Sequence, residues 1–374
     1  METQTMIKTY KVMVIAGEAS GDILAAGAME ALKASLDAPV EFIGVGGTEM
    51  QKQGLTSAFP MKELSIMGIA EVLPHIPNIL KRIKQMVELA KTEQPDLLLT
   101  IDSPDFCHRV AKKVKKEIGI PCVHYVSPSI WAWRRKRVFK MAKYLDHVLA
   151  LFPFEPDFYT PSTLKCSFVG HPVVARLAPH QVKSKQDTLL LMPGSRAREI
   201  TSLLPSFHKV AMQLKEEGAV KDVKCALATE DDFALAQEMA PALGREDCII
   251  GDERYAAMAS ARLAFAASGT ANLELAVLGT PMVVAYTTGK LTAYIARRII
   301  KVPFISPTNW VLGKKVIPEL LQEEFTEENL MTSAKEALSE NSVQPQALTT
   351  IRESLTTPNP NAEVSKILRS YLKA

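Results

Sequence analysis

The segment VMVIAGEASGD, residues 12–22, decides the fold, because five consecutive apolar residues run directly into a glycine-containing acidic loop. An apolar run of this length is typical of a strand that is buried on both faces, as in a parallel sheet covered by helices. We expect a helix to begin near Ile23. The loop at 17–22 then follows the carboxyl end of a strand, which is where open α/β sheets bind their ligands. A tight turn with Asp22 as a helix cap is the structural alternative.

The same alternation of apolar runs and amphipathic segments continues along the chain and falls into two groups. Strands are predicted at 12–16, 40–44, 97–101, 122–126 and 148–152, and again at 188–192, 223–227, 248–250, 263–266 and 282–285. Each group is typical of a doubly wound, Rossmann-like α/β lobe. A polar stretch without periodicity, residues 178–187, separates the groups. We therefore predict two domains, 1–180 and 181–374.

The end of the chain predicts helices at 318–323, 327–339 and 361–372. In two-lobed folds a last helix often crosses back to the first lobe, so both placements of the helix at 361–372 stay open.

The composition excludes several classes of protein. The 374 residues carry 44 Lys and Arg against 41 Asp and Glu, and 47% of them are hydrophobic. These values are those of a globular protein and exclude a disordered chain or a strongly basic nucleic-acid binder. The five cysteines are widely spaced and form no C-x-x-C pair, which argues against disulfides and structural zinc and favours a reducing cytosol. We see no secretory signal and expect no transmembrane helix.

The segment IDSPDF, residues 101–106, places two acids at the end of another predicted strand. A carboxyl group among sheet ends and apolar residues can have its pKa moved toward neutrality and act as a general base. Capping of a helix by Ser103 or Asp105 is the alternative. A metal clamp is disfavoured because the two acids lie three residues apart, and we expect no metal site.

The segment YVSPSIWAWRRKR, residues 125–137, combines two tryptophans, Trp131 and Trp133, with four consecutive cations. Stacking aromatics beside cations suit a sugar, a base or a phosphate. One short cluster on a chain with a net charge of +3 is weak evidence for nucleic acid, and we expect no nucleic-acid partner.

Two further turns follow strands of the second lobe and open helices. LMPGSR, residues 191–196, would offer backbone N–H groups of Gly194 and Ser195 and the guanidinium of Arg196 to a diphosphate. SGTANLE, residues 268–274, would do the same through Ser268, Gly269 and Thr270, while Glu274 suits hydrogen bonds from a ribose. Two anion-binding turns in one lobe predict a nucleotide site there.

An apolar segment at 64–77 precedes a basic amphipathic helix that extends to Lys91. This combination is a membrane-surface signature, although any core helix has the same pattern, and the pattern alone favours the core interpretation.

Taken together and in this order, the motifs closely resemble those of the lipid A disaccharide synthases, a family of inverting GT-B glycosyltransferases. The resemblance covers nearly the whole chain. It includes AGEASGD (16–22), GVGG (44–47), MGIAEVL (67–73), IDSPDF (101–106), HYVSPSIWAWRRKR (124–137), LFPFE (151–155), FVGHP (168–172), LMPGSR (191–196) and SGTANLE (268–274).

The resemblance implies two Rossmann-like domains that face each other across a cleft. The first would bind the acyl-sugar acceptor and the second the UDP-sugar. The reaction would join UDP-2,3-diacylglucosamine to 2,3-diacylglucosamine 1-phosphate (lipid X), giving the β-1,6-linked disaccharide 1-phosphate and UDP. It would need no cofactor and no metal, because Arg196 and helix N-termini would stabilise the leaving diphosphate.

The resemblance also implies roles for individual residues. Asp102 matches the family's candidate general base, and Glu18 matches the acid of its first loop. The implied substrate-binding residues are Ser20, Gly21, Trp133, Ser195, Arg196, Ser268, Gly269, Thr270, Glu274 and Asn309. Two lipid substrates imply peripheral association with the cytoplasmic leaflet of the inner membrane, for which residues 64–91 are a plausible platform. A homodimer stays open.

Two alternatives share part of this evidence. A UDP-N-acetylglucosamine 2-epimerase would have the same nucleotide half but would need neither the W-A-W cluster nor the apolar segment. A noncatalytic lipid- or nucleotide-binding protein could use the same cleft without turnover.

Overall fold

The computed structural model describes residues 8–64, 76–133, 135–182, 184–289, 293 and 302–372. It consists of two compact units, which we call the N-terminal and the C-terminal unit. The N-terminal unit contains Met1–Pro172 and Thr357–Ala374, and the C-terminal unit contains Val173–Thr356. The boundary between the units thus lies after Pro172, whereas the sequence predicts it near residue 180. The chain returns to the N-terminal unit at its end.

The N-terminal unit is built on a parallel sheet, in which the strands have the order β3-β2-β1-β4-β5-β6-β7. Its strands are β1 (Tyr10–Ala16), β2 (Val40–Val45), β3 (Thr56–Ser57), β4 (Leu97–Ile101), β5 (Cys122–Tyr125), β6 (His147–Ala150) and β7 (Lys165–Phe168). Five of them were predicted, whereas the short or half-exposed β3 and β7 were not. The chain adds β2 and β3 on one side of β1 and then returns to place β4 on the other. This reversal makes the carboxyl ends of β1 and β4 a switch point, where such sheets bind ligands.

Helices cover both faces of this sheet. They are α1 (Ala19–Ser35), α2 (Thr48–Lys52), α4 (Ile76–Glu93), α5 (Pro104–Glu117), α6 (Ile130–Trp133), α7 (Arg137–Met141) and α17 (Pro360–Leu372). The apolar sides of α4, α5 and α7 meet one face of the sheet, and those of α1 and α17 meet the other. Both faces being covered explains why the strands have continuous apolar sequences and no alternation.

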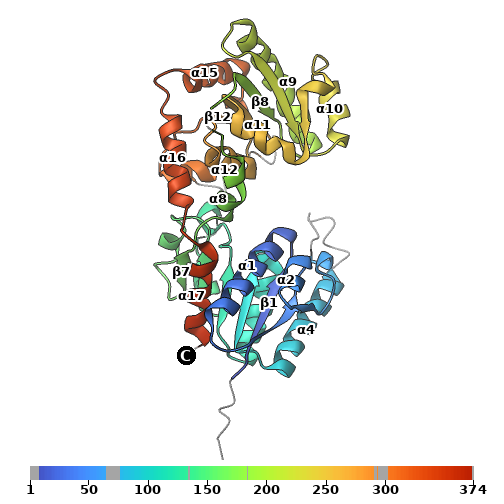
Figure 1. Ribbon diagram of the computed structural model, residues 1–374, viewed down its shortest axis with the longest axis vertical. Helices are drawn as coiled ribbons and strands as arrows, with labels where there is room; N and C mark the ends of the chain where they lie inside the picture. Colours follow the sequence, from blue (N-terminus) through green and yellow to red (C-terminus); the bar gives the residue numbers. More distant parts are fainter. Residues whose placement is uncertain are drawn as a thin grey trace, which may run out of the picture. The chain divides into compact units, whose positions relative to one another are not determined.

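The last helix, α17, packs along α1 (Figure 1). Small residues make this close approach possible: the Ser365 hydroxyl donates to the Ala31 carbonyl at 3.1 Å and lies 2.6 Å from the Ser35 hydroxyl. Val364 and Leu368 of α17 are fully buried in the same core as α1 and β1. The C-terminal helix is therefore an integral part of the N-terminal unit.

The C-terminal unit has a second parallel sheet, of the order β10-β9-β8-β11-β12-β13. Its strands are β8 (Thr188–Met192), β9 (Asp222–Leu227), β10 (Cys248–Ile250), β11 (Leu263–Ala267), β12 (Met282–Tyr286) and β13 (Glu319–Leu321). The two parallel α/β units confirm the predicted fold class. One prediction was wrong: residues 318–323 do not form a helix, because Glu319–Leu321 pair with β12 as an edge strand.

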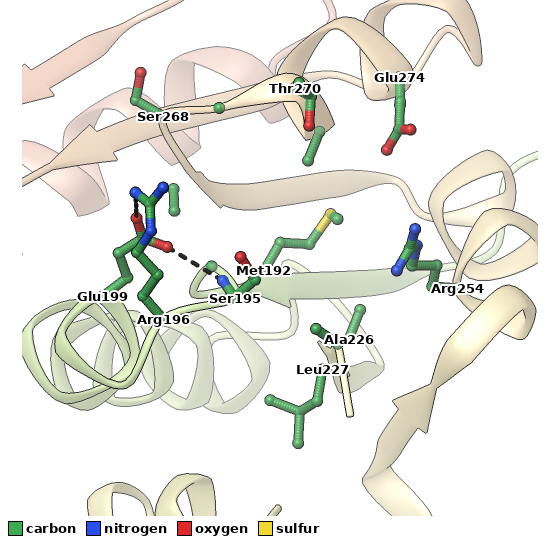
Figure 2. Close-up of a pocket in the computed structure, with 15 residues that line it drawn as sticks. Met192, Ser195, Arg196, Glu199, Ala226, Leu227, Arg254, Ser268, Thr270 and Glu274 are labelled. Atoms are coloured by element: carbon green, nitrogen blue, oxygen red, sulfur yellow. Dashed lines mark hydrogen bonds and ion pairs between the residues drawn. The ribbon is translucent and has the colours of Figure 1, made fainter. Parts of the chain in front are cut away.

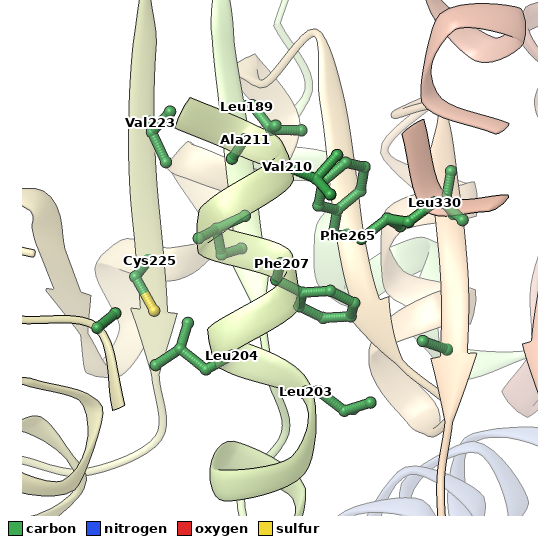
Figure 3. Close-up of a cluster of buried hydrophobic side chains, with 14 of the residues drawn as sticks. Leu189, Leu203, Leu204, Phe207, Val210, Ala211, Val223, Cys225, Phe265 and Leu330 are labelled. Atoms are coloured by element: carbon green, nitrogen blue, oxygen red, sulfur yellow. The ribbon is translucent and has the colours of Figure 1, made fainter. Parts of the chain in front are cut away.

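The helices of the C-terminal unit cover both faces of its sheet as well. They are α8 (Pro172–Leu177), α9 (Ala197–Glu216), α10 (Asp231–Met239), α11 (Arg254–Ser260), α12 (Thr270–Val277), α14 (Pro307–Leu312), α15 (Glu327–Leu338) and α16 (Gln344–Leu355). Figure 3 shows how α9 lays Leu204, Phe207 and Val210 on the sheet, beside Phe265 of β11 and Leu330 of α15. This packing fixes the start of α9, which borders the pocket described below.

Within the part of the chain that the structure describes, no helix combines the length and the apolar character needed to span a bilayer.

Candidate active site

Glu18 and Asp102 are brought together at the switch point of the N-terminal sheet. Ala16 and Ile101 are paired in register at the ends of β1 and β4, so the loops that carry the two acids leave the sheet side by side. Gly17 allows this approach, since a Cβ atom there would lie 2.3 Å from Ser103 Oγ. Glu18 precedes α1 and makes no capping hydrogen bond to it, which leaves its carboxylate for another role.

Asp102 has an unusual backbone and an altered acidity. Its φ of 49° and that of Ser103, 41°, are left-handed, a conformation that is uncommon outside glycine and often found at functional sites. The Asp102 N–H donates to the Tyr125 carbonyl at 2.9 Å, which anchors the turn to β5. Burial raises the pKa of the Asp102 carboxyl, against a hydrogen bond from the Ser103 backbone. Burial and the nearby charge of Asp102 likewise raise the pKa of Glu18. Such a pair is suited to accept a proton.

The other residues of the first loop have different surroundings. Ser20 is exposed on the first turn of α1, whereas Gly21 is buried against Ile101. The turn alternative supposed that Asp22 caps α1, but it does not. Its carboxylate accepts hydrogen bonds from the N–H groups of Gly47 (2.8 Å), Glu49 (2.9 Å) and Met50 (3.1 Å) and so caps α2. Asp22 therefore holds the GVGG loop beside the acids.

A hollow of about 490 Å³ adjoins that loop at the ends of β2 and β3 and is lined by Gly46, Gly47, Ser57, Phe59 and Met61 among others. It gives the N-terminal unit a surface depression on the ligand-binding edge of its sheet.

The W-A-W segment is attached to the rest of the unit by a buried acid that the sequence analysis did not single out. Glu155 is 3% exposed and accepts hydrogen bonds from the N–H groups of Leu151 (3.1 Å) and Phe152 (3.0 Å). The side chains of Ser127 and Trp131 also interact with its carboxyl and oppose the rise of its pKa, which relates the loop after β5 to the loop after β6. Burial raises the pKa of Glu155 to about 7.

Some predicted features fall outside the described residues. They are the side chain of Trp133 and the MGIAEVL motif at 67–73.

The C-terminal unit has a pocket of about 440 Å³ at the carboxyl ends of β8, β9 and β11 (Figure 2). Six of the predicted nucleotide-binding residues line it together: Ser195, Arg196, Ser268, Gly269, Thr270 and Glu274. The N-terminus of α12 points its first turn at this pocket and the start of α9 borders it, which favours an anion there.

At one side of the pocket, Glu199 occupies the turn that begins α9. Its carboxylate accepts the N–H of Ser195 at 3.1 Å and pairs with Arg196 at 3.2 Å. Gly194 has a φ of 108°, and a Cβ atom there would collide with the Glu199 carboxylate. The turn thus binds a carboxylate of its own chain with the groups that would bind a phosphate, and the Arg196 side chain is 79% exposed.

At the other side, Glu274 and Arg254 face the pocket (Figure 2). Glu274 is 8% exposed and pairs with Arg176 of α8, whose Nη2 lies 2.5 Å from Glu274 Oε1. The sequence analysis missed Arg176 and Arg254. Arg254 lies just beyond the predicted strand at 248–250, a position that could have indicated it, whereas the sequence around Arg176 offers no such signal.

Asn309 does not line this pocket. Its side chain is fully buried, donates to Ile317 O and Glu319 Oε1, both at 2.9 Å, and accepts the N–H groups of Val316 and Ile317 at 3.0 Å. Both ends of the amide are therefore engaged in holding the segment around α14 against β13.

Within the described ranges, no cluster of three or more His, Cys, Asp or Glu side chains is arranged to hold a metal ion.

Solved structures share this fold across nearly the whole chain. MurG of Acinetobacter baumannii has a TM-score of 0.58 at 14% identity, covering 97% of this chain and 99% of that one. A UDP-GlcNAc 2-epimerase from Neisseria meningitidis has a TM-score of 0.56 at 14% identity, covering 97% and 100%. At this identity the likeness is one of fold. Two parallel α/β units of this kind define the GT-B class of glycosyltransferase folds.

Sequence comparison identifies the family within that class. The family model described as lipid-A-disaccharide synthetase matches residues 12–366. The lipid-A-disaccharide synthase of Rhodospirillum centenum is 37% identical over 363 residues, covering 93% of this chain and 90% of that protein. That of Nitrobacter winogradskyi is 41% identical over 353 residues, covering 90% and 88%. The chain belongs to the lipid-A-disaccharide synthase family, which confirms the resemblance seen in its motifs and the prediction of a glycosyltransferase.

Proposed function

We propose that the chain transfers the sugar of UDP-2,3-diacylglucosamine to the 6-hydroxyl of 2,3-diacylglucosamine 1-phosphate, forming the β-1,6-linked disaccharide 1-phosphate and UDP. One observation carries the proposal beyond family membership: six residues predicted to bind UDP converge on one pocket of the C-terminal unit. An acid pair suited to proton transfer lies at the switch point of the N-terminal unit.

The donor's nucleotide would bind in the C-terminal unit. The diphosphate would accept hydrogen bonds from the turns at Ser195 and at 268–270, together with the guanidinium of Arg196. In doing so it would replace the Glu199 carboxylate, which already accepts the Ser195 N–H. Glu274 would accept hydrogen bonds from the ribose hydroxyls. The partial positive charge of the helix N-termini then stabilises the diphosphate as it leaves.

The acceptor would bind in the N-terminal unit, with its 6-hydroxyl at Asp102. Asp102 takes the hydroxyl proton as the oxygen attacks the anomeric carbon of the donor. The bond from that carbon to the UDP oxygen breaks on the opposite side, its electron pair leaves with UDP, and the configuration inverts. The raised pKa makes Asp102 a stronger base than an ordinary aspartate. Glu18 lies close enough to influence the same proton.

The test is an incubation of the purified protein with both acyl-sugar substrates in the presence of EDTA, with mass detection of products. We expect the disaccharide 1-phosphate and UDP in equal amounts. Consumption or epimerisation of UDP-N-acetylglucosamine, without disaccharide, would favour the epimerase alternative. UDP binding without any turnover would favour a noncatalytic binding protein.

We also propose that the N-terminal unit binds the membrane surface peripherally, because its substrates carry acyl chains. Residues 65–75 of the apolar segment at 64–77 lie outside the described residues, but the adjoining helix supports the proposal. Leu80 of α4 is 50% exposed, beside the exposed cations Lys81 and Lys84. Phe139 of α7, on the same face of the sheet, is also 50% exposed. Exposed apolar side chains among cations suit an anionic lipid surface.

Co-sedimentation with anionic phospholipid vesicles tests this second proposal. We expect Leu80→Glu to reduce the bound fraction strongly. Val343→Glu is the matched control, because Val343 is an exposed apolar residue (66%) of the C-terminal unit. Equal loss in both variants, or no loss in either, would contradict the assignment of this face.

A further inference from the structure

The guanidinium of Arg176 bridges two buried side chains beside the nucleotide pocket. Its Nη2 lies 2.5 Å from Glu274 Oε1, and its Nη1 donates to the Tyr255 hydroxyl at 3.1 Å. Tyr255 and Glu274 are each 8% exposed, whereas the Arg176 side chain is 53% exposed. Arg176 therefore reaches inward from the surface to two groups that are largely shielded from water.

The Tyr255 hydroxyl fixes the direction of this bridge. It also accepts a hydrogen bond from Arg254 Nη2 at 3.0 Å, and the guanidinium carbons of Arg176 and Arg254 lie 5.5 and 4.9 Å from its ring centroid. The two cations thus share one aromatic ring and one hydroxyl. Because a guanidinium is planar, its contact with Tyr255 determines how its other nitrogen meets Glu274.

Arg176 engages one oxygen of the Glu274 carboxylate, Oε1, and Glu274 lines the pocket. The second oxygen, Oε2, is then the one to accept hydrogen bonds from a ligand. Two neighbouring hydroxyls, such as those of a ribose, can both donate to one carboxylate. Without Arg176 the carboxylate could rotate or turn toward Arg254, and this acceptor would lose its fixed direction.

We propose that Arg176 is a positioning residue for nucleotide recognition: it holds Glu274 so that the carboxylate selects a ribonucleotide over its 2′-deoxy form. This inference rests on the proposed function, in which the pocket binds UDP. It assigns to α8, the helix that begins where the N-terminal unit ends, a part in recognising the sugar of the nucleotide.

The test compares the affinities for UDP and 2′-deoxy-UDP, measured by titration calorimetry on the full chain. For the wild type we expect UDP to bind at least about tenfold more tightly, the lower end of the range for one hydrogen bond to a charged group. In Arg176→Met the ratio should fall to between one and about threefold, mainly through weaker binding of UDP. Glu274→Gln should lower the ratio similarly, and combining the two substitutions should lower it no further.

Arg245→Met is the matched control. The Arg245 side chain is 51% exposed, pairs with Glu230 at 2.7 Å and lies over the Phe233 ring at 5.6 Å, as Arg176 does over Tyr255, but it is not part of the pocket. We expect the wild-type ratio in this variant. If Arg176→Met folds poorly, Arg176→Lys serves instead, since lysine keeps the charge but cannot bridge both partners. It should give an intermediate ratio.

The outcomes separate the two proposals. An unchanged ratio in Arg176→Met or Arg176→Lys, with UDP still bound, would overturn the role of Arg176 and leave the proposed function standing. Absence of UDP binding by the wild type would overturn both.

Discussion

Asp102 is the residue at which backbone strain, burial and proposed chemistry coincide. Left-handed backbone costs a non-glycine residue roughly 1–2 kcal/mol, so this turn persists because the surrounding structure holds it. The N–H of Asp102 is fixed by β5, and the adjoining Ser103 packs against Gly17. These contacts, which hold the strained turn, therefore fix where the carboxyl group lies, which a flexible loop would not do.

We predict that Asp102→Asn lowers kcat by about 10²–10⁴-fold, the usual contribution of a general base, while UDP affinity is retained. Steady-state kinetics and UDP titration test this. Asp105→Asn, an exposed acid three residues on, is the control and should stay near wild type. In the wild type, kcat/KM should fall as the pH drops through the raised pKa of Asp102, because the base becomes protonated. Wild-type turnover in Asp102→Asn would remove Asp102 from this role.

Glu155 should make the N-terminal unit less stable as the pH rises. Burial raises its pKa from 4.5 to about 7, so the folded state binds more protons than the unfolded state across this window. Stability then falls between these pH values by roughly 3 kcal/mol, at 1.36 kcal/mol per pKa unit.

We expect Glu155→Gln to be about as stable as the wild type at pH 4.5 and more stable at pH 8. Unfolding in guanidinium chloride at both pH values measures the free energy of unfolding. Glu49→Gln, at a side chain that is 43% exposed, is the control. If the difference between wild type and Glu155→Gln does not change with pH, the buried carboxyl does not carry this effect.

At the scale of elements, the contact between α1 and α17 depends on small residues. Ser365 is 2% exposed and lies against Ala31 and Ser35. We predict that Ser365→Leu destabilises the N-terminal unit by about 1–3 kcal/mol, the usual cost of overpacking. Thermal unfolding measures this. Ser370→Leu, on the exposed side of the same helix, should have little effect. Equal stability of the two variants would show that the contact tolerates a larger side chain.

The strands were predictable where burial alone determines them. The apolar runs at 97–101, 188–192 and 248–250 coincide with β4, β8 and β10. β13 was missed because Glu319 interrupts its apolar pattern. In the structure this buried carboxylate accepts the N–H groups of Ile305 and Ser306 and the amide of Asn309. The local sequence pattern of this segment predicts a helix. Tertiary hydrogen bonds, which such a pattern does not show, stabilise it as a strand instead.

The candidate site shows the same limit. The loops that follow strands and were predicted to bind the nucleotide line one pocket together, since all carboxyl ends of a parallel sheet lie on one edge. Arg176 was not predicted, because only the fold of the C-terminal unit brings α8 to the pocket. Asn309 was expected at the site from family resemblance, but its amide is taken up by internal hydrogen bonds.

At the scale of the whole molecule, the chain passes between the units twice, after Pro172 and before Thr357. The two passages meet within the N-terminal unit. The Thr357 hydroxyl donates to the Val169 carbonyl at 3.1 Å, and Gly170 lies against Thr357 with a φ of 94°. A Cβ atom at Gly170 would lie 2.2 Å from Thr357 Oγ1.

We predict that Gly170→Ala destabilises the protein by the backbone cost of about 1–2 kcal/mol, plus the cost of displacing Thr357. Gly218→Ala isolates the first cost, because Gly218 has a φ of 74° and a Cβ atom added there would meet open space among the described residues, with no contact within 4 Å. Thermal unfolding of both variants gives the difference. Equal losses would show that the contact between the two passages contributes nothing.

The place of α17 has a consequence for biosynthesis. Ala31 and Ser365, which touch in the finished protein, are 334 residues apart in the chain. During translation, α1 leaves the ribosome long before α17 has been synthesised. The apolar surface that Val364 and Leu368 cover in the finished protein stays exposed until then. The C-terminal unit is contiguous in sequence, so its folding does not require a later segment of the chain. The half of the protein that is synthesised first is thus the last to be completed, and until then it exposes apolar surface that chaperones recognise.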